Sequence, residues 1–143
     1  MSSRRSITTM GYALAQPGEW SPPSTLIDLS PDGTPELIAD LVHAFRDDAS
    51  IRLGELNIAL ERGQLDCASR AAHSIKGAAR QMGAEGVASI SERIEREAAG
   101  RTSEDLIDLA CGLRWVFLGE CEAMMAYLQQ QGCVSENGNR KLG

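Results

Sequence analysis

The feature that most constrains the fold is a helix-period apolar stripe near the end of the chain. From about 103 to 130, apolar residues recur at alternating spacings of three and four: Leu106, Ala110, Leu113, Phe117, Cys121, Met124 and Leu128. This spacing aligns them along one side of an α-helix, whereas a half-buried strand would alternate every second residue. The stripe therefore predicts a long helix that buries one side, as in an antiparallel bundle.

Helical periodicity also occurs in the earlier segments, and we find no convincing strand. A short helix or turn at 26–29 precedes a helix that begins at Thr34-Pro35-Glu36, where Thr34 can cap and Pro35 fits the first turn. This pattern is interrupted at Asp47-Asp48 and resumes up to Gly63, which leaves open a kinked continuation or a new helix. Further helices are expected at about 65–82 and 84–98. We predict an all-α, antiparallel up-and-down four-helix bundle at 24–131, with a short extra N-terminal helix, a flexible arm at 1–23 and a disordered tail at 132–143.

Composition narrows the classes of function. The net charge of -6 disfavours nucleic-acid binding, and only 4% of the residues are aromatic, so aliphatic side chains must fill the core. No apolar run is long enough to span a membrane or to form a signal peptide after Arg4-Arg5. The four cysteines, at 67, 111, 121 and 133, form neither a C-x-x-C pair nor a zinc pattern, so we expect buried or half-buried thiols in a reducing compartment. These features predict a cytoplasmic protein.

One segment, 71–83, combines a histidine that could act as a nucleophile with neighbouring basic and small residues. On a helix, the small and apolar positions Ala68, Ala71, Ile75, Ala79 and Met82 form the core side, and His73 then points roughly 170° away from it. Lys76 and Gly77 follow His73 on the same face. A neutral imidazole is a nucleophile near pH 7, a lysine can offset phosphoryl charge, and a glycine gives a bulky partner access. No acidic residue lies within three positions of His73, which fits a phosphate carrier better than a phosphatase.

This segment resembles the histidine-phosphotransfer (HPt) domain family, whose motif H-x-x-K-G with a further glycine six residues on is matched by His73, Lys76, Gly77 and Gly83. The resemblance extends over about 26–129, with Pro35-Glu36-Leu37-Ile38 and Ile94-Glu95 also similar. It implies a four-helix bundle in which His73 is the phosphoacceptor. It also implies that Glu95 binds the other imidazole nitrogen, and that a partner receiver domain supplies Mg²⁺ and an aspartate. We expect no cofactor and no metal on this chain.

We therefore predict a phosphocarrier, and not a turnover enzyme, that relays a phosphoryl group between receiver-domain aspartates of response regulators or hybrid kinases. Alternatives remain open: a binding module that sequesters a receiver or a kinase, or the phosphoacceptor domain of a separate kinase. Glu95 could equally be a solvated glutamate, and Arg70 and Arg80 could steer an acidic receiver or simply solubilise the helix. His43, without lysine or glycine partners at the required offsets, is expected to be a surface residue. A monomer is expected, and Met1 favours a complete protein over part of a larger hybrid kinase.

Overall fold

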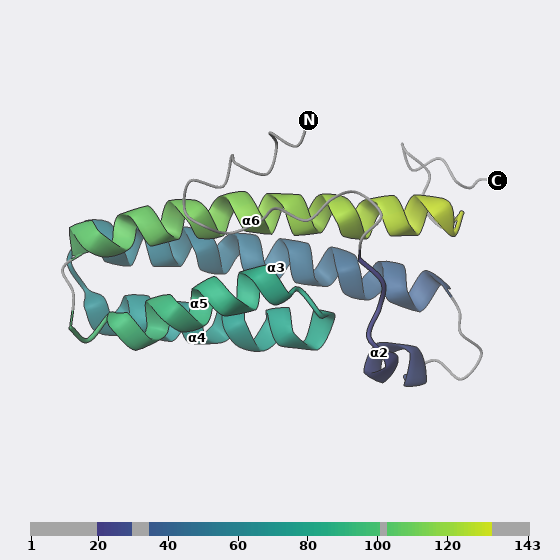
Figure 1. Ribbon diagram of the computed structural model, residues 1–143, viewed down its shortest axis with the longest axis horizontal. Coiled ribbons are helices and arrows are strands. Elements are labelled where there is room, and N and C mark those ends of the chain that lie inside the picture. The colour runs from purple at the N-terminus through teal and green to yellow at the C-terminus, as the bar shows by residue number, and fades with distance from the viewer. Residues whose placement is uncertain (1–19, 30–34, 101–102, 133–143) are drawn as a thin grey trace, which may run out of the picture.

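Five helices make up the part of the chain that the computed structural model describes, residues 20–29, 35–100 and 103–132, and no strand occurs in it. They are α2 (Ser24–Asp28), α3 (Pro35–Glu61), α4 (Leu65–Met82), α5 (Glu85–Glu97) and α6 (Ser103–Gln130). Figure 1 shows α3 to α6 side by side and the short α2 near one end. The predicted all-α bundle with a short extra N-terminal helix is confirmed.

The four long helices form a closed ring of neighbours. α3 packs on α4 and α6, and α5 also packs on α4 and α6. α4 and α6 therefore lie diagonally across the bundle, and the chain reverses direction from each helix to the next (Figure 1). This is the up-and-down arrangement that short connections favour.

α3 is one continuous helix, so the alternative of a separate helix after Asp47-Asp48 does not hold. Both aspartates are exposed, while the buried side continues past them at Ala49, Leu53 and Leu56. The two aspartates do not end the helix, because charged side chains are tolerated on its solvent-exposed face.

α4 ends at Gly83, as its sequence predicted. The backbone of Gly83 has a φ of 72°, in the left-handed region that glycine adopts most readily, and the amide of Ala84 donates to the carbonyl of Ala79 at 2.8 Å. A Cβ atom at Gly83 would also lie 2.9 Å from Cγ of Pro23. Glycine at position 83 therefore allows both the left-handed turn after α4 and the close approach of Pro23.

Trp20, which falls in the segment predicted to be a flexible arm, packs against the bundle. The indole of Trp20 is 8% exposed, donates from Nε1 to the carbonyl of Met82 at 2.8 Å, and packs edge-on against the ring of Tyr127 at 5.4 Å. Residues 20–23 therefore belong to the bundle, because the buried Trp20 contacts two helices and so fixes this segment on them. The remaining residues of the predicted arm, 1–19, and of the tail, 133–143, lie outside the described residues.

The core is aliphatic, as the low aromatic content predicted. Its largest fully buried side chains are Leu56, Leu60, Ile75, Ile90, Ile94, Leu106, Leu113, Met124 and Leu128. Phe45 of α3 and Phe117 of α6 add an aromatic pair with ring centroids 5.9 Å apart. The expectation of buried or half-buried thiols holds for Cys121 but is wrong for Cys67 and Cys111, which are exposed because they lie on the outer faces of their helices.

Candidate functional site

His73 lies midway along α4 and points into solvent. Its side chain is 66% exposed, while Ala72 and Ile75 on either side of it in sequence are fully buried. The helical periodicity of α4 produces this arrangement, because its alanines pack against α3 and α5 and leave His73 on the outer side. The exposed orientation predicted from the helical spacing is therefore observed.

Glu95 of α5 binds both functional side chains of α4. Its Oε2 atom lies 2.9 Å from Nδ1 of His73, and its Oε1 atom lies 2.7 Å from Nζ of Lys76. Lys76 is only 16% exposed, so its ammonium is held against Glu95. Ser69 also donates a long hydrogen bond of 3.4 Å to the backbone carbonyl of Glu95, which ties α4 to α5 at this point.

The charge of Glu95 determines which imidazole nitrogen of His73 carries the proton and which carries the free lone pair. The hydrogen bond from Lys76 lowers the pKa of Glu95 below its ordinary value, burial opposes this shift, and the contact with His73 lowers the pKa further. An ionised carboxylate can only accept a hydrogen bond, so Nδ1 of His73 must be the donor. In the neutral ring Nε2 then carries the free lone pair, because one nitrogen of a neutral imidazole holds the proton.

Gly77 is not required by the packing of the bundle. A Cβ atom built at this position meets no atom within 4 Å, and the residue is exposed on α4 beside the imidazole. A glycine inside a helix costs about 1 kcal/mol relative to alanine. Since no described residue packs into the space that a side chain at position 77 would fill, this space beside His73 is open to another molecule.

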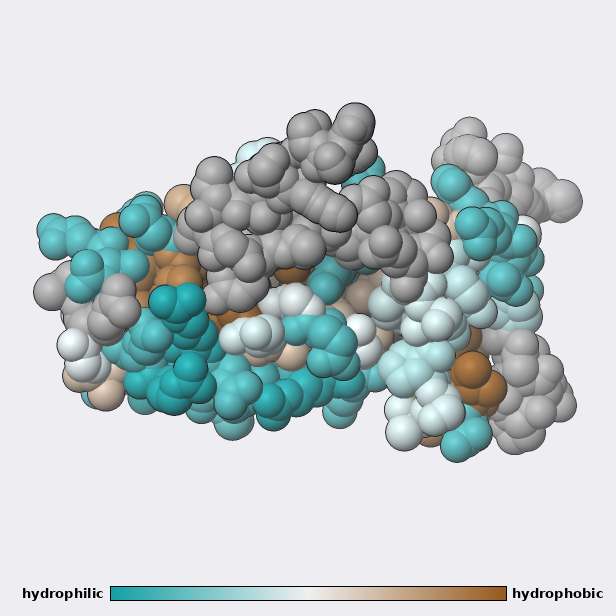
Figure 2. All heavy atoms as spheres, viewed as in Figure 1, coloured by the Kyte–Doolittle hydropathy of each residue, from teal (hydrophilic) through white to brown (hydrophobic). Residues whose placement is uncertain are grey.

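One further ion pair connects α4 and α5 and a second lies within α5, along the edge where Figure 2 shows mostly hydrophilic (teal) residues over these two helices. Arg80, two turns after His73, lies 2.9 Å from Oε1 of Glu92, and Arg96 approaches the same carboxylate at 3.8 Å. Both arginines are more than half exposed, so each pair contributes little stability, about 0–1 kcal/mol. Arg80 thus has an intramolecular partner, which the sequence did not indicate.

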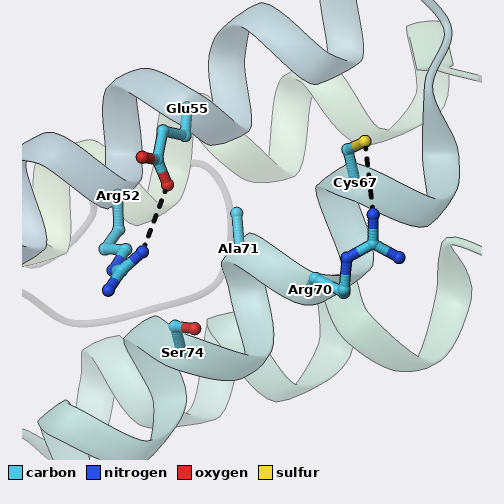
Figure 3. Close-up of a pocket in the computed structure, with 6 residues that line it drawn as sticks. All are labelled: Arg52, Glu55, Cys67, Arg70, Ala71 and Ser74. Atoms are coloured by element: carbon cyan, nitrogen blue, oxygen red, sulfur yellow. Dashed lines mark hydrogen bonds and ion pairs between the residues drawn. The ribbon is translucent and has the colours of Figure 1, made fainter.

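A groove of about 430 Å³ lies on the other side of His73, between α3 and α4. Figure 3 shows its lining, in which Cys67, Arg70, Ala71 and Ser74 of α4 face Arg52 and Glu55 of α3. Arg52 lies 3.4 Å from Glu55, and Arg70 donates to the sulfur of Cys67 at 3.6 Å. His73 therefore stands between this polar groove on the α3 side and the Glu95–Lys76 pair on the α5 side.

Among the described residues, neither a metal-ligating cluster nor a membrane-spanning helix occurs. These residues contain no group of three or more histidine, cysteine, aspartate or glutamate side chains arranged to hold a metal ion. None of the helices among them is long and apolar enough to cross a membrane.

The structure brings together all four site residues expected from the sequence: His73, Lys76, Gly77 and Glu95. The contact between Glu95 and Lys76 was not expected. The two residues lie 19 positions apart on different helices, so no local pattern could indicate it. The contact between Glu95 and His73 was predicted only from the family resemblance.

Comparison with known proteins agrees with the helical-bundle architecture. The family model for the Hpt domain matches residues 40–131, which is more than half of the chain and includes every site residue named above. The chain therefore belongs to the Hpt domain family, the domains of phosphotransfer in phosphorelays. Comparisons with curated proteins and with solved structures gave no match.

Proposed function

We propose that this protein is a phosphocarrier in which Nε2 of His73 takes a phosphoryl group from a receiver-domain aspartate and passes it to a second receiver. The observation that carries the proposal is the contact of Glu95 with Nδ1, which leaves the outward-facing Nε2 as the nucleophile. In this proposal the protein is a carrier and not a turnover enzyme, because His73 itself holds the phosphoryl group after the first step and is regenerated when the group passes to the second receiver.

The proposed reaction needs little covalent help from the bundle. The lone pair of Nε2 attacks phosphorus in line, the N–P bond forms, and the P–O bond to the aspartate breaks, so that the electron pair returns to the aspartate as a carboxylate. The Nδ1 proton stays between His73 and Glu95 throughout. The carboxylate of Glu95 then offsets the positive charge that develops on the phosphorylated ring. The reverse sequence delivers the group to the next aspartate.

Lys76 and Gly77 have distinct roles in this proposal. The Lys76 ammonium, held by Glu95 beside the ring, attracts the transferred phosphoryl group as a compact point charge. The empty space at Gly77 lets the partner bring its aspartyl phosphate close to Nε2. Proximity and charge are the main contributions that phosphoryl transfer requires from a protein.

We further propose that the receiver covers the face between the groove and Gly77. Arg70 and Ser74 line the groove from α4, so a receiver placed over His73 would contact them. The receiver would supply Mg²⁺ and the reacting aspartate, as the resemblance to the family implies. A monomeric carrier in the cytoplasm remains our proposal, in keeping with free Cys67, Cys111 and Cys121.

Phosphoryl transfer from a panel of radiolabelled phospho-receivers tests the proposal. The wild-type chain and His73→Gln are compared, and His43→Gln is the matched control because His43 is the other histidine of the sequence. We expect acid-labile, base-stable label on the wild type and on His43→Gln, and none on His73→Gln. Receivers that bind the wild type without labelling it would contradict the proposal and favour the sequestering module.

A further inference from the structure

A second apolar face runs along α6, on its solvent side. Its large members are exposed: Ile107 (39%), Trp115 (65%) and Leu118 (53%), and Cys111 is also exposed. At 100° per residue, positions 107, 111, 115 and 118 fall within about 80° of arc, so they form one stripe, which we call the Trp115 face. Contiguous apolar residues of this kind in water indicate a surface that packs against another segment.

The Trp115 face lies far from the phosphotransfer site. α6 and α4 are diagonal in the bundle (Figure 1). The side chains of this face and of His73 are exposed, on the side of each helix that faces away from the shared core. A segment packed on the Trp115 face would therefore leave the surroundings of His73 free. The inference is thus independent of the proposed function.

Carboxylates border the Trp115 face and argue against a second copy as its occupant. Exposed Glu104 and Glu122 lie at its two ends and Asp108 lies beside it, while Arg114 near its middle leaves the surroundings net negative. Antiparallel pairing of two copies would place Glu104 of one against Glu122 of the other, and parallel pairing would place each carboxylate against itself. Like charges across an interface oppose association. The face therefore fits an apolar segment that carries basic residues.

The N-terminal part of this chain has that chemistry. Ile7, Met10 and Leu14 recur at spacings of three and four, and Arg4-Arg5 precede them. In a helical conformation this spacing would align the three apolar side chains on one side. The two arginines would complement the acidic border of the Trp115 face.

The N-terminal segment is also long enough and begins in the right place. It joins the bundle at Trp20, whose ring packs against Tyr127 of α6 itself. At 1.5 Å per residue, Leu118 lies about 14 Å and Glu104 about 35 Å along α6 from Tyr127. With residues 7–14 helical and the others extended, the stretch from Arg4 to Trp20 can span about 40 Å, slightly more than the distance to Glu104.

We propose that residues 1–19 pack in cis along α6 and cover the Trp115 face. Ile7, Met10 and Leu14 then contact the apolar stripe, and Arg4-Arg5 lie toward its acidic border. Trp20 fixes the end of this segment to α6 and, through Met82, to the end of the helix that carries His73.

The thiol of Cys111 reports directly on this packing. We would measure alkylation of each cysteine by iodoacetamide, by mass spectrometry, in the full chain and in the triple variant Ile7→Asp/Met10→Asp/Leu14→Asp. The matched control is Thr8→Asp/Thr9→Asp/Gln16→Asp, which adds the same charge outside the apolar spacing. Exposed Cys67 on α4 serves as the internal reference for reagent reactivity.

We expect Cys111 to react about tenfold more slowly in the wild type and the control than in the triple variant, as a packing equilibrium favoured by about 1.4 kcal/mol would produce. Cys67 should react equally in all three proteins. Buried Cys121 should stay unreactive; if the triple variant exposes it, Arg4→Glu/Arg5→Glu replaces that variant, with an acceleration at Cys111 again expected. Equal rates at Cys111 would overturn the proposal. Protection that grows with protein concentration would also overturn it, by assigning the face to a second copy.

Discussion

The Nδ1 atom of His73 lies 2.9 Å from Oε2 of Glu95, a carboxylate that the neighbouring helix α5 contributes. The same carboxylate lies 2.7 Å from Lys76 through its other oxygen. One side chain thus orients the imidazole that we propose as the nucleophile and holds the Lys76 ammonium beside it. Removal of Glu95 should therefore affect the chemistry of both residues.

Glu95→Ala should slow phosphoryl transfer to His73 by about 10- to 100-fold, the effect of losing a charged hydrogen bond of about 1.5–3 kcal/mol. The physical reasons are that the ring loses the acceptor that fixes its tautomer and that Lys76 loses its anchor. Rapid-quench transfer from a phospho-receiver measures the rate. Glu92→Ala, which removes the partner of Arg80 on the same helix, is the control and should leave the rate nearly unchanged. Equal losses in the two variants would show that general charge, and not the Glu95 contacts, matters.

The lowered pKa of Glu95 also predicts a pH dependence of stability. A carboxyl whose pKa is lower in the folded protein stabilises the fold above its ordinary pKa of 4.5, and this contribution is lost as the pH falls through the lowered value. The wild type should therefore melt higher than Glu95→Gln at neutral pH, and the difference should shrink below pH 4.5. Thermal melts of both proteins over a series of acidic buffers measure it. A difference that stays constant or grows in acid would mean that the ionised carboxylate is not what stabilises this contact.

Gly77→Ala should separate stability from function. The new methyl group meets nothing within the bundle, so the helix should gain up to about 1 kcal/mol from the better helix propensity of alanine. Transfer should nevertheless slow, because the methyl group occupies space that the receiver needs. Gly54→Ala on α3 is the matched control, since a Cβ atom there also meets nothing, and it should gain stability without loss of transfer. Unchanged transfer in Gly77→Ala would remove the proposed role of this glycine.

Local patterns predicted much of the fold and part of the site. The bounds of α4 and the outward direction of His73 follow from apolar spacing and from Gly83, because both act within a few residues. The contact of Trp20 with Met82 and the contact of Glu95 with Lys76 join distant parts of the chain, so spacing alone could not indicate them. The apolar spacing of α6 predicted its buried side correctly, but it did not indicate that Ile107, Trp115 and Leu118 form a second, exposed apolar face.

Glu120 illustrates a further long-range contact, one that stabilises the fold. This half-buried carboxylate of α6 accepts hydrogen bonds from the amides of Gly86 at 2.8 Å and Val87 at 3.2 Å, at the start of α5. Burial raises its pKa although both amides oppose the shift. Glu120→Ala should lower the free energy of unfolding by about 1–3 kcal/mol, because two partly buried amides lose their acceptor.

Gly86→Ala should also destabilise the protein, since a Cβ atom at Gly86 would lie 2.7 Å from Oε2 of Glu120 and 2.7 Å from Cγ1 of Val116. Urea unfolding measures both variants. Exposed Glu61→Ala on α3 is the control and should change stability by no more than about 0.5 kcal/mol. A Glu120→Ala variant as stable as this control would refute the capping role.

Identification of the phosphorylated atom tests the proposed role of His73 directly. The protein, labelled with ¹⁵N in its histidine rings, is phosphorylated by a phospho-receiver and examined by NMR for coupling between ¹⁵N and ³¹P. Because Glu95 holds Nδ1, we expect one phosphoryl group on Nε2 of His73, with the proton retained on Nδ1. A phosphoryl group on Nδ1 of His73, or on any other residue, would contradict this expectation.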